Sequence, residues 1–356
     1  MRIAVLGVGL IGGSVGLAAR QRLGATVAGY DPDPSALSRA AERGAVDEAA
    51  TDPAAAVGGA EVVFVAGPVG VLPQAVGTAL QMAGPECVVT DVGSTKRGIV
   101  SRIEDPRFVG GHPLAGAASS GVEHARADLF EGATWYLTPV AGTSGILYER
   151  LHRLLRAIGA RPAAIDPETH DVLLAAVSHL PHVLANTLVE QATQALASGP
   201  ERLPATGPSF RDATRVAGAS SAIWTDIYLS NADALARQID AAVSRLEAVS
   251  QALRRGDAAW IVDWNERAAG QRARLMEGQI GAGPLREVRA SVPNRPGVVA
   301  QLALELGRAG VNIVDLALHP APDMSEGVIA LWVSGQEAAQ RAAELVRGLG
   351  YAAALA

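Results

Sequence analysis

The chain has 356 residues, too many for one ordinary hydrophobic core, so two or three domains are expected. Hydrophobic residues make up 49% of the chain and charged residues 19%, which is typical of a folded globular protein and excludes a disordered one. The net charge of −6, without a basic block, argues against a nucleic-acid partner, and the one cysteine, Cys87, excludes an internal disulfide and predicts a reducing cytoplasm.

The N-terminal stretch MRIAVLGVGLIGGSVGLAAR resembles a secretory signal in its early arginine and long apolar run. Its glycines at positions 7, 9, 12 and 13 fit a phosphate-binding loop better than a secretory helix, so no signal peptide is expected. Elsewhere no apolar run approaches the roughly 20 residues that span a bilayer, and we expect no membrane segment.

Residues 1–165 alternate short apolar runs with helical stretches. The runs are continuous and are flanked by Gly, Pro or Asp, which is typical of strands buried on both faces of a sheet. Expected strands cover 2–8, 26–31, 61–67, 87–93, 107–113 and 133–139, and expected helices cover 12–22, 34–43 and 145–158. This alternation predicts an α/β domain with a Rossmann-like, parallel, doubly wound sheet.

The pattern changes twice further along the chain. Residues 166–280 have long Ala, Leu and Val stretches with helical periodicity at 168–198, 209–230 and 231–255. Helices this apolar need a partner surface, which predicts an all-helical substrate and dimerisation domain and a homodimer. Residues 285–356 then follow the order strand, helix, strand, strand, helix, strand, which predicts a small ferredoxin-like βαββαβ domain.

The motif GVGLIGGS follows the first expected strand and opens a helix, as a dinucleotide-binding fingerprint requires. Its first glycine makes the turn, the second admits the pyrophosphate and the third packs the helix on the strand. Asp31 ends the second strand, where a carboxylate binds the adenosine ribose and repels a 2′-phosphate, so NAD rather than NADP is the expected cofactor. The expected cofactor contacts are Gly7, Gly9, Leu10, Ile11, Gly12 and Asp31.

Two further motifs begin at strand ends, where open α/β sheets bind ligands. TDVGSTKRG (90–98) directs Ser94 and Lys96, the only lysine of the chain, toward the nicotinamide end of the cofactor. GGHPLAGAASSG (110–121) comes from the end of the next strand, so His112 is expected at the same crevice. A catalytic role is favoured there, because catalytic groups concentrate on loops held by a rigid sheet.

The stretch VSHLPHVL (177–184) places His179 and His182 on one face of an apolar helix. They are candidate metal ligands, a candidate catalytic pair, or two core histidines with backbone partners. A metal is not expected, because no third ligand is in sight. Pro181 lacks a backbone N–H and is expected to bend the helix there.

These motifs in this order, GxGxxGGS, DVGSTK, GGHPLAG, SHLPH and FRDATRVA (210–217), resemble the prephenate and arogenate dehydrogenases of tyrosine biosynthesis. The segment VPNRPGVVAQLALELGRAGVNI (292–313) resembles an ACT domain, an amino-acid-sensing module. The resemblance covers nearly the whole chain. Family members often have a Thr or Ser and then a Glu where this chain has Ala117 and Ala118, so discrimination between keto-acid and amino-acid substrates stays open.

The resemblance implies NAD-dependent oxidative decarboxylation of prephenate to 4-hydroxyphenylpyruvate. His112 matches the catalytic base of the family and Ser94 the serine that orients it and touches the same hydroxyl. Arg215 matches the arginine that binds a substrate carboxylate, and His182 the histidine that reaches the substrate side chain. Ser178 and Lys96 are further expected substrate contacts. His179 is assigned equally to substrate binding or to a structural hydrogen bond.

The ACT resemblance implies an L-tyrosine effector, bound where loops meet across a paired domain, with Asn294 and Asn312 as candidate contacts. Two alternatives to a prephenate dehydrogenase remain. An arogenate dehydrogenase performs the same chemistry on an aminated side chain. A non-enzymatic NAD or amino-acid sensor would keep the glycine loop and the ACT unit without needing Ser94, His112 and Arg215 together.

Overall fold

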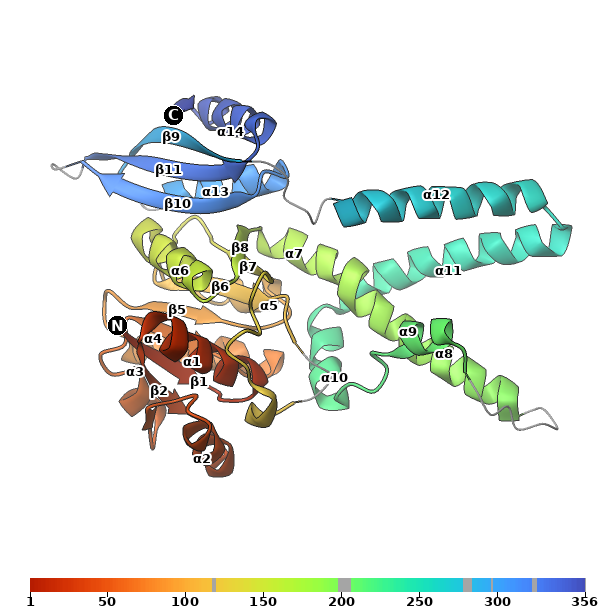
Figure 1. The fold of residues 1–356 in the computed structure, drawn as a ribbon, viewed down its shortest axis with the longest axis horizontal. Helices are drawn as coiled ribbons and strands as arrows, with labels where there is room; N and C mark the ends of the chain where they lie inside the picture. Colours follow the sequence, from red (N-terminus) through yellow and green to blue (C-terminus); the bar gives the residue numbers. More distant parts are fainter. Residues whose placement is uncertain (117–119, 198–205, 278–283, 296, 322–324, 356) are drawn as a thin grey trace.

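A computed structural model describes the chain apart from residues 117–119, 198–205, 278–283, 296, 322–324 and 356. The described residues form an α/β unit, an extended helical unit and a second, smaller α/β unit in chain order (Figure 1). Ala117 and Ala118 lie outside the described residues.

The first unit is built on an eight-stranded sheet in the order β3-β2-β1-β4-β5-β6-β7-β8. All the expected strands are present. The strands are β1 (Arg2–Leu6), β2 (Thr26–Tyr30), β3 (Glu48–Ala49), β4 (Val62–Val65), β5 (Val88–Asp91), β6 (Phe108–Pro113), β7 (Thr134–Thr138) and β8 (Arg161–Ala164).

Two features of this sheet differ from the sequence-based expectation. The edge strands β3 and β8 were not anticipated, because they are short and carry few fully buried side chains. The sheet is also not wholly parallel, since β7 runs antiparallel to β6 and β8 runs parallel to β7. Strands β1 to β6 pair in parallel as expected.

Helices cover both faces of the sheet, and the strand side chains alternate between them. Ile3 and Val5 of β1 join the core on one face, whereas Ala4 and Leu6 join the core on the other. This period of two is what a doubly wound sheet requires. The helices are α1 (Leu10–Leu23), α2 (Pro34–Glu42), α3 (Pro53–Val57), α4 (Leu72–Met82), α5 (Arg97–Val100) and α6 (Gly145–Ala157).

The helical unit begins with one long run, α7 (Pro167–Leu174), a π-helical turn (Ala175–His179) and α8 (Leu180–Ala197). The π turn lies just before Pro181, so the helix adjusts to the missing N–H by widening one turn. Helices α9 (Pro208–Thr214) and α10 (Ser221–Ser230) replace the single helix expected at 209–230, because the intervening segment contains Gly218. Helices α11 (Ala232–Arg255) and α12 (Ala258–Glu277) form a hairpin that extends away from the rest of the chain (Figure 1).

Contrary to expectation, the run Pro167–Ala195 is long and apolar enough to cross a membrane by length and composition. Its most apolar window has a mean hydropathy of 1.6, and 28% of that window is buried in the single chain. One such helix is weak evidence for a membrane segment. In this run His170 is fully buried and contacts His112 on β6, while Leu184 and Leu188 are exposed, a pattern that also fits a subunit interface.

The C-terminal unit has the expected βαββαβ order: β9 (Leu285–Pro293), α13 (Val298–Arg308), β10 (Ile313–Pro320), β11 (Glu326–Ser334), α14 (Gln336–Gly348) and β12 (Ala352–Leu355). Its antiparallel sheet has the order β10-β11-β9-β12. Asn294 follows the end of β9 and Asn312 precedes the start of β10, so the strand register places them at opposite ends of this sheet. A site that uses both residues therefore needs a second copy of the unit.

Candidate active site

The glycine-rich loop joins β1 to α1 with contacts that side chains would prevent. Gly7 has a φ of 95° and donates its N–H to the Tyr30 carbonyl at 2.8 Å, and a Cβ there would lie 1.7 Å from the Ala66 oxygen. A Cβ at Gly12 would lie 1.9 Å from the Gly7 oxygen. At Gly9, the N-cap of α1, a Cβ would meet nothing within 4 Å, and no side chain caps the helix. The loop therefore packs tightly against β1 and its neighbours at Gly7 and Gly12, whereas the N–H groups at the N-terminus of α1 have no capping side chain.

Asp31 lies just past the end of β2, next to this loop. Its carboxylate accepts hydrogen bonds from the backbone N–H of Val8 at 2.9 Å and of Asp33 at 2.9 Å. A pocket of about 440 Å³ adjoins it, lined largely by apolar groups, among them Pro32, Pro53, Ala75 and Met82. The sheet order reverses between β1 and β4 at this place, which is where open α/β sheets bind ligands.

Glycines also shape the strand that carries His112. A Cβ at Gly110 would lie 2.2 Å from the Thr138 hydroxyl, and one at Gly111 would lie 2.6 Å from the Asp91 carbonyl. The two glycines of GGHP thus let β6 pack closely between β5 and β7. This packing fixes the position of His112 relative to both neighbouring strands.

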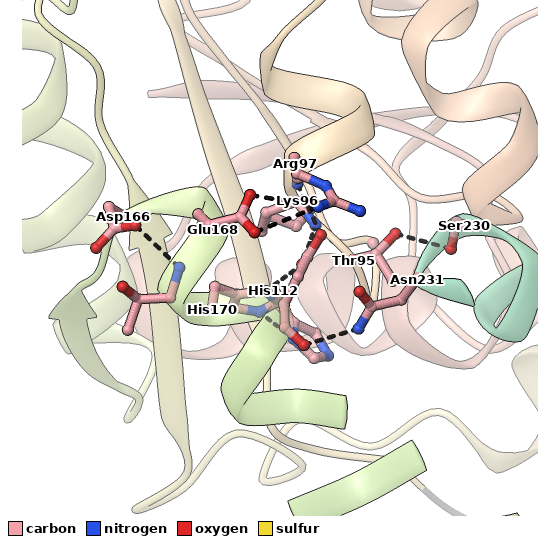
Figure 2. A network of polar contacts seen from close by, with 12 residues as sticks. Thr95, Lys96, Arg97, His112, Asp166, Glu168, His170, Ser230 and Asn231 are labelled. Carbon is pink, nitrogen blue, oxygen red and sulfur yellow. Dashed lines mark hydrogen bonds and ion pairs between the residues drawn. The ribbon is translucent and has the colours of Figure 1, made fainter. Parts of the chain in front are cut away.

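His112 of β6 takes part in a chain of three side chains with His170 and Asp171 of α7. Its Nδ1 lies 2.9 Å from Nε2 of His170, whose Nδ1 lies 2.8 Å from Oδ1 of Asp171. Figure 2 shows His112 and His170 side by side, with α7 bringing His170 to β6. Asp171 also accepts hydrogen bonds from the backbone N–H groups of Lys96 at 2.7 Å and Arg97 at 3.0 Å. In the described chain Nε2 of His112 has no hydrogen-bond partner, and it is not fully covered although the residue as a whole is buried.

The surroundings of His112 favour its neutral form. Burial lowers the pKa of His112 well below its usual value, and the nearby His170, Lys96 and His179 act in the same direction. Burial also lowers the pKa of His170, although Asp171 opposes this shift.

Lys96 is not placed as a substrate ligand, which corrects the expectation from the sequence. Its side chain is fully buried, and its ammonium group is paired with Oδ2 of Asp91. Asp91 also accepts from the N–H groups of Gly93 at 2.8 Å and Gly111 at 3.1 Å. The Asp91 carboxylate therefore joins Lys96 and the turn after β5 to the neighbouring strand β6. Burial lowers the pKa of Lys96, and Asp91 opposes the shift.

Ser94 does not orient His112 in this structure. It is half-buried on the turn after β5, and its side chain makes no hydrogen bond within the described residues. Nδ1 of His112 is held by His170 instead.

His179 has a structural partner, as one of its two expected roles requires. Its Nδ1 lies 3.3 Å from Nδ2 of Asn231, and the same amide group donates to the Asp171 carbonyl at 2.7 Å. Burial lowers the pKa of His179 to about 4. Ser178 beside it is half-buried without a hydrogen bond in the described part of the chain. Asn231 thus ties the start of α11 to the histidine-bearing helix (Figure 2).

His182 lies one helical turn further along, against two aromatic side chains of α10. Its ring stacks on Trp224 with centroids 3.6 Å apart and an angle of 5°, and its Nδ1 contacts the Tyr228 hydroxyl. Its Nε2 is buried with no partner in hydrogen-bond geometry. Burial lowers the pKa of His182, which the nearby Val216 backbone opposes. Arg215, which precedes Val216 in the chain, is exposed, and its side chain makes no ion pair or hydrogen bond within the described residues.

Several site residues escaped the sequence analysis: His170, Asp171, Trp224, Tyr228 and Asn231. His170 and Asp171 sit in PETHDV, which has the ordinary pattern of a helix N-terminus, and their partners are distant in sequence. The i, i+4 spacing of Trp224 and Tyr228 was the one available signal, because it places both rings on one helix face. Within the described residues no group of three His, Cys, Asp or Glu side chains could hold a metal ion.

A glycine-rich loop at the switch point of a largely parallel sheet, with a neutral histidine near the carboxyl end of β6 in the same sheet, defines a dinucleotide-dependent dehydrogenase. Comparison with known proteins identifies the group. The family model described as "Prephenate dehydrogenase, nucleotide-binding domain" matches residues 15–163, and "Prephenate dehydrogenase, dimerization domain" matches residues 166–265. The chain belongs to the prephenate dehydrogenase family.

Individual relatives agree with this assignment. The chain is 30% identical to prephenate dehydrogenase of Bacillus subtilis over 97% of this chain and 95% of the relative. The A. aeolicus prephenate dehydrogenase, solved with hydroxyphenyl propionate and NAD+, is 29% identical with a TM-score of 0.71, covering 77% of this chain and 98% of that one. Synechocystis arogenate dehydrogenase is 28% identical with a TM-score of 0.67, covering 77% of this chain and 100% of that one.

Proposed function

We propose that the protein catalyses the oxidative decarboxylation of prephenate to 4-hydroxyphenylpyruvate with NAD+ as the hydride acceptor. The observation that carries this proposal is His112, a neutral histidine near the carboxyl end of β6, in the same sheet whose β1 leads into the dinucleotide loop, with an Nε2 that has no partner among the described residues. Membership of the family supports an enzyme, and the sensor alternative is set aside.

The residues present fit a dinucleotide. The uncapped N–H groups at the α1 N-terminus suit a pyrophosphate, and the apolar pocket beside Asp31 suits the adenosine half. Asp31 suits a ribose 2′-hydroxyl and opposes a 2′-phosphate, which favours NAD+ over NADP+. When bound, the cofactor accepts the hydride from ring carbon C4 of the substrate.

His112 then has one task, which is to take the proton of the C4 hydroxyl as the hydride leaves. The resulting ketone-like carbon draws electrons from the C1 carboxylate bond, and loss of carbon dioxide makes the ring aromatic. Ser94, on the adjacent turn, is proposed to contact the same hydroxyl.

The carboxylates of the substrate need cationic or hydrogen-bonding partners. Arg215 has an exposed guanidinium without a partner among the described residues, and its planar fork suits a carboxylate. His182 offers an unpaired Nε2, and its ring is held by Trp224 and Tyr228. We propose that these two groups bind the substrate, with Ser178 beside them on the same helix.

Arogenate is the second candidate substrate, because the similarity extends to Synechocystis arogenate dehydrogenase over nearly the same share of this chain. Steady-state rates with prephenate and with arogenate, each with NAD+ and with NADP+, test the proposal. The highest kcat/KM is expected for prephenate with NAD+. A higher kcat/KM for arogenate would transfer the proposal to that substrate, and no turnover of either would refute it.

We further propose a homodimer that acts in the cytoplasm. The matched dimerization domain leaves large apolar side chains uncovered in the single chain, including Leu229, Leu246, Leu253 and Val262. The one cysteine, Cys87, is buried and unpaired, which suits a reducing compartment. Light scattering at micromolar concentration tests the dimer.

A further inference from the structure

His170 is a buried histidine that the proposed reaction does not use directly, yet it contacts the proposed base. It comes from α7, whereas His112 comes from β6, so the helical unit supplies it to the nucleotide-binding unit. The side chain of His170 is fully buried, and both of its ring nitrogens have partners. A side chain that is paired on both sides can fix where the protons of its neighbours lie.

The hydrogen bonds can be followed from Asp171 outward. Both carboxylate oxygens of Asp171 accept backbone N–H groups, and its contact with Nδ1 of His170 is of the same kind, which places a proton on Nδ1 of His170. A neutral His170 then has no proton on Nε2. The 2.9 Å contact with His112 therefore requires the proton on Nδ1 of His112.

The opposite tautomer of His112 is unfavourable. With its proton on Nε2, His112 would turn a lone pair toward the lone pair of His170 at 2.9 Å. Protonating His170 would relieve this repulsion, but burial and the Lys96 charge oppose a cation there. His112 would also lose its function in that tautomer, because its Nε2 would have no lone pair to accept a proton.

We propose that His170, backed by Asp171, is the positioning residue that holds His112 in the Nδ1–H tautomer, with the Nε2 lone pair facing the substrate. In the reaction the hydroxyl proton passes to Nε2, while the C4–H electron pair leaves as hydride to NAD+. His112 becomes an imidazolium that still donates from Nδ1 to His170, so the proton stays on His112. The role in catalysis rests on the proposed function, whereas the tautomer itself does not.

The tautomer can be measured without activity. Nitrogen NMR of 15N-histidine-labelled protein distinguishes protonated from unprotonated ring nitrogens, and the chain has only seven histidines. His112→Asn assigns the His112 signals. We expect wild-type His112 to be neutral at pH 7, with Nδ1 protonated and Nε2 unprotonated. A protonated Nε2 would overturn the proposal.

Kinetics of variants test the consequence for catalysis. His170→Phe keeps a ring but removes the acceptor, and kcat is expected to fall about 10²-fold with KM changed by less than about twofold. His170→Gln can still accept from Nδ1–H through its side-chain oxygen, and the loss of kcat is expected to be about tenfold or less. His124→Gln, an exposed histidine of the same unit, is the matched control and should retain wild-type kcat.

The outcomes separate the two proposals. A folded His170→Phe variant with wild-type kcat would overturn the positioning role. If that variant does not fold, the tautomer of His112 measured by NMR in the wild-type protein decides whether the proposal stands. Absence of prephenate and arogenate turnover, together with the expected tautomer, would refute the proposed function and leave the arrangement of His112 and His170 intact.

Discussion

His112 must be neutral to accept a proton, and the groups around it keep it so. It is buried, and the other charges that influence it are cationic or can become so: Lys96, His170 and His179. A histidine with a lowered pKa keeps its free lone pair below the pH at which an ordinary histidine would be protonated. The cost is a weaker base, which is acceptable because the hydroxyl becomes acidic as the hydride leaves.

The first prediction concerns the base. His112→Asn should lower kcat by about 10²–10⁴-fold with little change in NAD+ binding, because a positioned base contributes about that much. Arg215→Ala is the contrasting variant and should mainly raise KM, because it removes carboxylate binding. Steady-state kinetics and NAD+ titration measure both. Wild-type kcat in His112→Asn would show that another group is the base.

The lowered pKa gives this prediction a pH dependence. The active form is neutral His112, so log(kcat/KM) should stay level as the pH falls through 6.5 and decline only at lower pH. A decline centred above pH 6.5 would contradict the assignment.

The second prediction concerns Asp31. A 2′-phosphate would approach this carboxylate, so NAD+ should be preferred by about 10²-fold or more in kcat/KM. The variant Asp31→Ser with Pro32→Arg should raise NADP+ use, and Asp33→Ser, on the same turn, should leave the preference unchanged. Equal wild-type efficiency with both cofactors would contradict this role of Asp31.

At the scale of elements, local patterns predicted most of the fold. Continuous apolar runs identified β1, β2, β4, β5, β6 and β7, and helical periodicity identified the helical unit up to the end of α11 but missed α12. The antiparallel direction of β7 was missed, because the direction of a strand depends on its pairing partners and does not change the hydrophobic pattern of its own sequence. For the same reason the motifs marked His112 and the SHLPH helix face but missed His170, whose contact with His112 spans 58 positions of the chain.

The Lys96–Asp91 pair supplies the third prediction. Lys96→Met would leave Asp91 buried with only its backbone donors, and breaking a buried pair costs about 3–5 kcal/mol of unfolding free energy. Urea unfolding should show this loss, and Lys96→Met with Asp91→Asn should recover part of it. Arg126→Met breaks an exposed pair with Asp128 and should cost less than about 1 kcal/mol. Equal stability of the Lys96→Met and Arg126→Met variants would show that the buried Lys96–Asp91 pair does not stabilise the fold.

At the scale of the whole molecule, the C-terminal unit packs against the nucleotide-binding unit. Gly307 of α13 approaches the Ala164 carbonyl so closely that a Cβ would lie 2.4 Å from it, and Arg156 of α6 pairs with Asp315 of β10. A pocket of about 380 Å³ lies between the two units, and Asn294 is among its lining residues. A ligand at this loop therefore contacts the unit that carries His112, which offers a physical route from an effector to the catalytic crevice.

The last prediction follows from this contact. We propose that L-tyrosine binds the C-terminal unit at the Asn294 and Asn312 loops, and that two copies of the unit complete each site, because one copy holds these residues at opposite ends of its sheet. L-Tyrosine should then inhibit the full-length enzyme. A variant truncated after residue 283 should stay active, since the A. aeolicus and Synechocystis relatives align over 77% of this chain yet nearly all of their own length. Its inhibition constant should rise about 5- to 150-fold, the usual range of coupling between sites.

Tyrosine also resembles the aromatic product, so it can compete at the catalytic crevice. The two forms must therefore be compared at the same ratio of prephenate to KM, where competitive inhibition affects both equally. Asn312→Ala in the full-length chain separates loss of the site from loss of the whole unit, and it should weaken inhibition with little change in kcat. Equal tyrosine sensitivity in the truncated and full-length forms would assign the inhibition to the catalytic crevice, and the C-terminal unit would then have no part in sensing.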